Sequence, residues 1–349
     1  MSLATPPKIE KLQKALHAKA KEEPEFRFYQ LYDKVYREDI LAHAYALCRV
    51  NGGAPGVDGE DFEAIELQGR EGWLGELRQT LKERSYRAAP VRRVWIPKAS
   101  GGRRGLGIPN VVDRVVQAAI RRVLEPMYEP TFHPSSHGFR PRRGGHTAIQ
   151  QARRYVAEGY EWVVDIDLKS FFDRVSHQRL MARLAERVGD RRVLQLLGRL
   201  LKAKVVLPNG VKVSNEEGVP QGGPLSPLLS NIVLDELDRE LARRGHRFVR
   251  YADDCNVYVR SERAGHRVMA SLTRFIERRL RLEVNTSKSA VARPEQRHFI
   301  GFRLQPQAEG VEVLLSERSK ERLDAKVKER QRKKFVKSPF PKLDDDSSR

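Results

Sequence analysis

The chain has 349 residues with 66 lysines and arginines against 46 aspartates and glutamates, a formal net charge of +20 at neutral pH. This excess excludes an acidic or neutral small-molecule enzyme as the default and favours a polyphosphate partner, with an anionic membrane surface as a weaker second. Hydrophobic residues make up 40% of the chain, enough to bury a core, so a disordered basic tail is excluded too. The length predicts about two domains, or one unit divided by a cleft.

Cysteine usage and the absence of long apolar runs predict a cytoplasmic protein. Cys48 and Cys255 suggest neither a disulfide framework nor a cysteine metal site. The start of the chain lacks the apolar segment of a secretion signal, and no run of about 18 apolar residues predicts a membrane span. We therefore expect no membrane partner.

The first part of the chain predicts helices followed by a basic hairpin. Residues 1–50 carry apolar side chains at helical intervals, and residues 51–59 hold four glycines and a proline, which favour an irregular loop. Strands are expected at 92–97 and 106–109, joined by a turn at Ser100-Gly-Gly. An apolar stripe with a step of four then predicts a helix from Val111 to Leu124.

The middle of the chain has the composition of a mixed α/β unit. Helices are predicted at 178–203, 227–243 and 264–281, the second with Ser226 as its N-cap. The strands predicted between them have β-branched and aromatic residues, and the last two are separated by a tight turn; they lie at 161–167, 248–251 and 255–259.

Aspartates occur beside these strands, where acids are costly. Asp167 ends one apolar strand, and Asp253 and Asp254 lie between two others. An unpaired buried carboxylate costs several kcal/mol, so a compensating divalent cation is expected. Mg²⁺ prefers one or two carboxylates together with phosphates, and two such ions about 4 Å apart can activate a 3′ hydroxyl. An isolated Asp-Asp pair is more often an exposed turn, so these acids alone leave both interpretations open.

Seven ordered blocks resemble reverse transcriptases. Tyr251-Ala-Asp-Asp254 resembles the central signature of the family, and Asp165–Asp173 its first palm motif. The others are similar to the template and nucleotide motif, the closing palm strand, and three blocks of bacterial group II intron-encoded enzymes; they lie at Gly218–Pro227, Phe299–Phe302, Gly53–Gly59, Arg104–Pro109 and His137–Pro141. The resemblance covers about residues 50 to 302.

This resemblance implies a catalytic set. Asp167, Asp253 and Asp254 match the carboxylates that bind two Mg²⁺ ions, for which Mn²⁺ is a possible substitute, and Ile166 is included in the expected metal set. Asp165, two residues back on the same strand face, competes with Asp167 for the first position. Lys288 matches a lysine considered a general acid for pyrophosphate, with an ordinary surface lysine as the equal alternative.

The resemblance also implies nucleotide and nucleic-acid contacts. Phe172 matches the bulky residue that excludes a ribose 2′ hydroxyl, and core packing is its alternative role. Gln221 and Gly222 belong to a turn that approaches the nucleotide closely. The remaining expected contacts are basic. Lys98 and Arg104 are expected to contact the triphosphate, with contact to template phosphates alone as the alternative. Arg140 and Arg143 are expected to contact primer or template, with a solvated loop as the alternative.

The implied protein is an RNA-directed DNA polymerase that extends a DNA primer with dNTPs on an RNA template. The expected fold is α+β, a right hand with a palm of antiparallel sheet and helices on one side. Its divisions are an N-terminal helical extension, fingers, palm and a shortened thumb with a basic tail, at 1–50, 51–150, 151–302 and 303–349. The alternatives are an RNA-binding splicing cofactor (maturase) with group II intron RNA as partner, or an inactive remnant.

Overall fold

The computed structural model describes residues 3–97 and 101–336. Helix α6 lies at the centre of the first half, because the apolar stripe predicted for it is almost entirely buried. It extends to Tyr128, beyond the predicted end, and α1, α2 and α3 pack against it. The helices of this part are α1 (Pro7–Glu22), α2 (Tyr32–Val35), α3 (Glu38–Asn51), α4 (Phe62–Gln68), α5 (Arg70–Lys82) and α6 (Val111–Tyr128).

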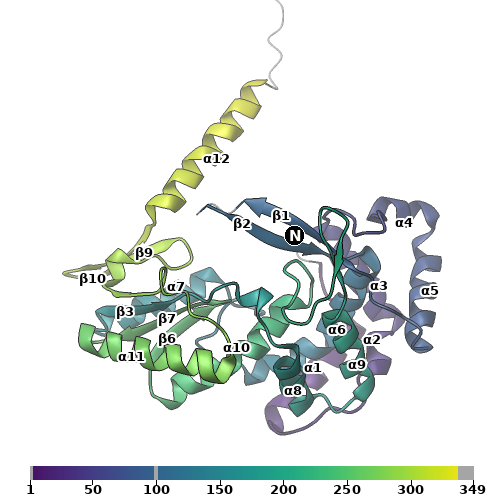
Figure 1. Ribbon diagram of the computed structural model, residues 1–349, viewed down its shortest axis with the longest axis horizontal. Coiled ribbons are helices and arrows are strands. Elements are labelled where there is room, and N and C mark those ends of the chain that lie inside the picture. The colour runs from purple at the N-terminus through teal and green to yellow at the C-terminus, as the bar shows by residue number, and fades with distance from the viewer. Residues whose placement is uncertain (1–2, 98–100, 337–349) are drawn as a thin grey trace, which may run out of the picture.

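The predicted basic hairpin is present as β1 (Val91–Pro97) and β2 (Arg103–Ile108), paired antiparallel from Arg92↔Ile108 to Pro97↔Arg103. β1 also pairs in parallel with β4 (Val205–Val206), which pairs with β5 (Lys212–Val213). In Figure 1 the β1–β2 hairpin projects from the helical half over the second sheet. The structure thus places this hairpin above that sheet.

The second sheet has four antiparallel strands in the order β6-β7-β3-β8. The strands are β3 (Trp162–Ile166), β6 (Arg247–Tyr251), β7 (Asp254–Val259) and β8 (Ala290–Ala292). β6 and β7 form a hairpin whose last pair is Tyr251↔Asp254, so only two residues make the turn. The first of them, Ala252, has a φ of 57°, which a β-carbon rarely tolerates.

Both faces of this sheet are covered, whereas helices were predicted on one side. Successive strand residues alternate between two apolar clusters, so each face has side chains to bury. Helices α10 (Ser226–Arg243) and α11 (Glu262–Phe275) cover one face, and a π-helical turn at Ile276–Leu280 continues α11. Helix α7 (Gly145–Ala157) and the hairpin of β9 (Phe302–Gln307) and β10 (Gly310–Leu315) lie on the other.

Two predicted helices differ in detail. The segment 178–203 forms two helices, α8 (His177–Arg187) and α9 (Arg191–Leu201). The break occurs because Asp190 N-caps α9 and also accepts hydrogen bonds from the main-chain N–H groups of Leu31 and Tyr32 at 3.0 and 2.9 Å. Ser226 is the first residue of α10 and not its N-cap, since its hydroxyl donates to the carbonyl of Pro220 at 2.6 Å.

The segment Phe299–Phe302 was predicted to be the closing palm strand, and this was wrong. It is a tight turn in which Phe299 and Phe302 exchange main-chain hydrogen bonds, with positive φ angles at Ile300 and Gly301. β8 is the fourth strand of the sheet instead. The long helix α12 (Glu317–Val336) then extends away from the body of the molecule (Figure 1). The division of the chain at residues 50, 150 and 302 stays a prediction.

Candidate active site

Four aspartates gather where β3 ends and the β6–β7 hairpin turns. Asp165 is paired with Asn256 across β3 and β7, so Asp165, Asp167 and Asp254 lie on one face of the sheet by strand alternation. The charge of Asp167 acts on the carboxyls of both Asp253 and Asp254. The structure therefore brings together acids from two segments that lie far apart in the sequence, Asp165–Asp167 and Asp253–Asp254.

Mutual repulsion of these acids is visible in their pKa values. Burial, and then repulsion from Asp167, raises the pKa of Asp253, while Arg104 and Arg250 oppose the shift. Desolvation by the surrounding protein atoms, and then the charges of the neighbouring acids, raise the pKa of Asp254 as well, although the residue as a whole is exposed to solvent. Both groups would be stabilised by a cation at this end of the sheet.

Asp165 differs from Asp167 in having a cationic partner. It accepts a hydrogen bond from Arg297 Nε at 2.9 Å and a second from Nη2, and the pair is largely buried. Within the described ranges, no ion pair reaches Asp167, Asp253 or Asp254. The guanidinium of Arg297 already compensates Asp165, which favours Asp167 as the free acid of this strand.

The loop 285–289 fixes the end of β3. The main-chain N–H of Asp167 donates to Ser289 Oγ at 3.0 Å, and the N–H of Asn285 donates to the Asp167 carbonyl at 2.8 Å. Lys288 belongs to this loop and is exposed. Its positive charge partly opposes the rise in the pKa of Asp254. The charge of Lys288 therefore acts on the acids at this end of the sheet, and its role as a general acid stays a prediction.

The β1–β2 hairpin contacts the loop that carries Gln221 and Gly222. The N–H of Gly107 in β2 donates to the Gln221 carbonyl at 2.7 Å. A β-carbon on Gly222, which has a φ of 121°, would lie 2.5 Å from the Gly107 carbonyl oxygen. Only glycine permits this approach, and it keeps the strand of Arg104 near the acids.

Phe172 lies in the 3₁₀ turn Phe171–Asp173 that follows the first acids. It is half-buried, with its ring centroid 5.1 Å from that of Phe171, and its carbonyl accepts from the Val219 N–H at 2.6 Å. A cavity of about 80 Å³ lies between Phe172, Gly107 and the Val219 loop. Phe172 therefore has both a packing role and an exposed part. Lys98, the other expected triphosphate contact, lies outside the described residues.

Arg140 does not have the role expected of it. Its side chain is only 4% exposed, and all five of its N–H bonds are used within the protein. The acceptors are the Glu129 carboxylate and the carbonyls of Glu129, His133 and Ser136, so no donor remains for nucleic acid. Arg143 is half-buried and donates to the Pro134 carbonyl at 2.5 Å.

The most deeply buried charge near the acids is Arg250, which the sequence reasoning missed. Its side chain is fully buried and donates to both oxygens of Asp238, at 2.8 and 2.6 Å. It also donates to Asn231 Oδ1, Ser136 Oγ and the Ala252 carbonyl, at 2.9, 2.7 and 2.8 Å. Arg250 thus ties the two-residue turn before Asp254 to α10. The sequence signal that could have identified Arg250 was its position in the middle of an apolar strand.

The acids provide the ligand type that Mg²⁺ prefers, but their positions do not form a complete metal site. Carboxylate oxygens are the ligands that Mg²⁺ prefers. Over residues 3–97 and 101–336, however, no three His, Cys, Asp or Glu side chains lie close enough to hold a metal by themselves. The side chain of Ile166 is a buried hydrocarbon without a ligand atom, so only its main-chain carbonyl could serve as the ligand that was expected there.

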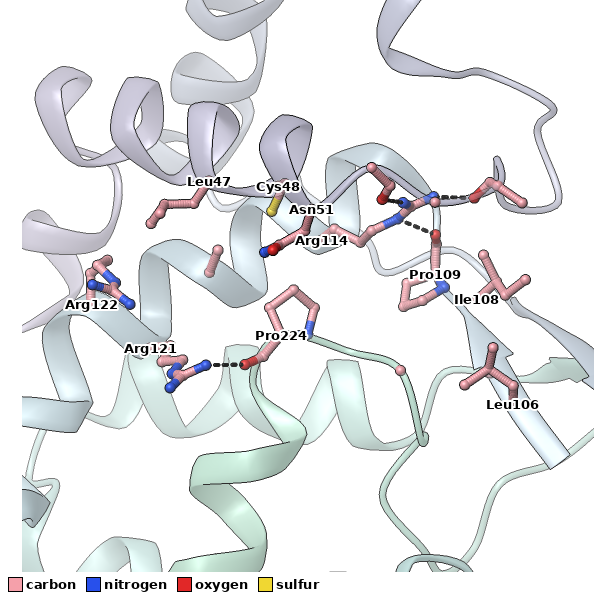
Figure 2. A pocket seen from close by; sticks show the side chains of 16 residues that line it. Leu47, Cys48, Asn51, Leu106, Ile108, Pro109, Arg114, Arg121, Arg122 and Pro224 are labelled. Carbon is pink, nitrogen blue, oxygen red and sulfur yellow. Dashed lines mark hydrogen bonds between the residues drawn. The ribbon is translucent and has the colours of Figure 1, made fainter. Parts of the chain in front are cut away.

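A larger cavity, of about 430 Å³, lies away from these acids, between α3, α6 and the Gly222–Pro224 loop (Figure 2). Two of the arginines that line it, Arg114 and Arg121, are already hydrogen-bonded within the protein. Arg114 donates to the carbonyls of Gly52, Ala54 and Pro109, and Arg121 donates to Glu125 and to the Pro224 carbonyl. None of the four aspartates lines this cavity, so we place the candidate active site at the end of the palm sheet.

Residues 96–304, more than half of the chain, match the family model described as reverse transcriptase (RNA-dependent DNA polymerase). The chain belongs to the reverse transcriptase family. It is 37% identical to Protein YkfC of Escherichia coli over 68% of its length, and 36% identical to the group II intron-encoded protein LtrA of Lactococcus lactis over 61%. These matches span 63% of YkfC and 35% of LtrA, less than two thirds of either protein.

The fold agrees with this membership. A telomerase structure from Candida albicans covers 71% of this chain and 49% of its own, at a TM-score of 0.50 and 15% identity. Such a low identity shows the fold alone, and that fold is the predicted α+β polymerase fold. Among the helices of the described part of the chain, none has the length and apolar character that crossing a bilayer requires.

Proposed function

We propose that this chain extends a DNA primer with dNTPs on an RNA template. The carrying observation is that Asp167, Asp253 and Asp254 lie at one end of the palm sheet, form no ion pair within the described residues, and feel each other's charge. The charge of Arg104, on the β1–β2 hairpin, also acts on Asp253. Membership of the reverse transcriptase family supports the reaction class. The net charge of +20 supports a nucleic-acid partner.

Asp167, Asp253 and Asp254 would hold Mg²⁺, with Mn²⁺ as a possible substitute. When bound, the ions would neutralise phosphate charge and lower the pKa of a 3′ hydroxyl. Because Mg²⁺ commonly completes its shell with substrate phosphates and water, the acids need not form a cage without the nucleotide. Arg297 keeps Asp165 out of this set.

The remaining side chains of the site would bind and select the nucleotide. Arg104 would place positive charge against the triphosphate, where charge develops during transfer. The half-buried ring of Phe172 would exclude a ribose 2′ hydroxyl by its volume. Lys288 would donate a proton toward the leaving pyrophosphate, and its effect on Asp254 shows that its charge acts at this end of the sheet.

Primer extension tests the proposal. Poly(rA) annealed to oligo(dT), with dTTP and Mg²⁺, should give products with the wild-type chain. Asp253→Asn should lower the rate at least about 100-fold, corresponding to a loss of several kcal/mol of transition-state stabilisation. Asp33→Asn, which removes an exposed acid paired with Lys34, is the matched control and should leave the rate within about twofold. Equal rates for Asp253→Asn and wild type would remove the site assignment.

A second candidate is RNA binding without catalysis, as a splicing cofactor for group II intron RNA. The similarity to the intron-encoded protein LtrA favours this possibility. Specific intron RNA binding that is unchanged in Asp253→Asn, with no extension by the wild-type chain, would support it over the polymerase.

A further inference from the structure

An aromatic residue with an unusual backbone conformation lies next to the two-residue turn Ala252–Asp253, which we call the catalytic turn. Phe139 is 40% exposed and belongs to neither of the two apolar clusters. Its φ is 61°, in the left-handed region that bulky residues rarely occupy. Neither burial nor backbone preference accounts for a phenylalanine here.

The residues on both sides of Phe139 are fixed. A β-carbon on Gly138 would lie 2.2 Å from the main-chain nitrogen of Ala252, so this segment packs directly against the Ala252–Asp253 turn. The Gly138 carbonyl accepts from Asn231 Nδ2 at 2.9 Å. On the other side, Arg140 is held by its five internal hydrogen bonds.

Strain of this kind persists when the surrounding structure enforces it, and such positions concentrate at functional sites. Here the enforced conformation presents a ring to solvent one residue from a contact with the catalytic turn. The chain has a net charge of +20, so its electrostatic attraction to nucleic acid does not depend on this residue. The aromatic ring of Phe139 offers an apolar surface that can contact sugars and base edges, which a charged side chain does not provide.

We propose that Phe139 is a nucleic-acid-binding residue whose ring packs against the sugar and base edges of the primer–template duplex beside the catalytic turn. This inference rests on the proposed function. An RNA–DNA duplex with A-like geometry has a wide, shallow minor groove that admits a side chain without base-specific contacts. Phe139 would hold the duplex by shape and apolar contact, and Arg140, the expected ligand of this segment, supports it from within the protein.

Equilibrium binding without Mg²⁺ tests this inference apart from catalysis. A fluorescently labelled DNA primer annealed to RNA is titrated with the chain at several NaCl concentrations, and anisotropy gives Kd. Phe139→Gly and Phe139→Asn both tolerate a positive φ, and each should raise Kd about 5- to 10-fold at every salt concentration. The slope of log Kd against log salt should not change, because no phosphate contact is lost.

Three variants act as controls. Phe139→Tyr keeps the ring and should restore wild-type Kd. Arg281→Gly changes another exposed residue with a positive φ, 58°, and Leu67→Ala truncates a leucine that is 90% exposed. Both should leave Kd within about twofold, apart from the small change in salt slope caused by losing a charge at Arg281.

The possible results separate the inference from the function on which it rests. Wild-type Kd in both Phe139→Gly and Phe139→Asn would overturn the inference and leave the proposed polymerase intact. A loss of binding matched by a fall in melting temperature in both variants, with no rescue by Phe139→Tyr, would also overturn it by showing a structural role. Absence of any primer–template binding by the wild-type chain would overturn both proposals.

Discussion

Arg250 and Asp238 form a two-contact ion pair in which both side chains are fully buried. Removing one partner leaves the other charge uncompensated in the interior. We expect Arg250→Met and Asp238→Leu each to lower the free energy of unfolding by about 3–5 kcal/mol. Urea unfolding followed by circular dichroism measures this change.

The double variant provides the sharper test of this pair. Because replacing both charges removes the uncompensated group, Arg250→Met with Asp238→Leu should recover a good part of the loss. Arg243→Met removes an exposed arginine from its pair with Glu240, which keeps Arg244 as a partner, and should cost less than about 1 kcal/mol. Additive losses in the double variant would contradict the coupling.

Asp165 and Asp167 should respond differently to the same substitution. Asp167→Asn removes a free carboxylate and keeps the main-chain bonds to Ser289 and Asn285, so the chain should fold while primer extension falls at least about 100-fold. Asp165→Asn breaks the pair with Arg297, and should lower the melting temperature while keeping extension within about tenfold. The opposite ranking of the two rates would show that Asp165 is the acid required for extension.

Gly222→Ala should disturb the contact between the β1–β2 hairpin and the loop that carries Gln221 and Gly222. The added methyl group meets the Gly107 carbonyl oxygen at 2.5 Å, and the φ of 121° is strained for alanine. Gly210→Ala is the matched control, because Gly210 has a φ of 82° and nothing within 4 Å of the added carbon. We expect the control to cost about 1 kcal/mol and Gly222→Ala to cost more, with reduced extension. Equal unfolding midpoints in urea would contradict the close approach.

Stability should depend on pH through Asp113, a buried residue of α6. Burial raises the pKa of this carboxyl to about 6. The Tyr86 hydroxyl donates to Oδ1, and Oδ2 has no hydrogen-bond partner in the part of the chain that the structure describes. Between about pH 4 and 6 the folded chain holds a proton that the unfolded chain has released. The free energy of unfolding contributed by this group therefore falls as pH rises through that window, by about 3 kcal/mol in total.

Comparison with Asp113→Asn isolates this contribution. The difference in unfolding free energy between wild type and variant, measured in urea at intervals from pH 4 to 7, should move in favour of the variant as pH rises. A difference that stays constant over this range would show that the carboxyl ionises with an ordinary pKa.

Much of the architecture could be predicted because it depends on local patterns. The stripe of α6 and the β1–β2 and β6–β7 hairpins follow from periodicity and turn residues, and their presence is confirmed. The break between α8 and α9 could not be predicted in the same way. It depends on Asp190 binding main-chain groups near Leu31, about 160 residues away in the chain.

The polar interior of the site was harder to predict than its acids. Arg140 occurs in an arginine-rich segment that resembles a solvated loop, yet Glu129 and nearby carbonyls take all of its hydrogen bonds. Whether an arginine faces solvent or a buried acceptor is decided by tertiary contacts. The same holds for Arg250, whose partner Asp238 lies on another element.

The attachment of Asp167 to the loop 285–289 has a consequence for how this end of the palm responds to change. Ser289 and Asn285 hold the main chain of the acid, and Lys288 lies between them. Asp167 and the loop that carries Lys288 are therefore connected by hydrogen bonds, and a movement of one displaces the other. Lengthening this loop to alter the lysine would also displace the carboxylate, so the two groups are not independent targets for redesign.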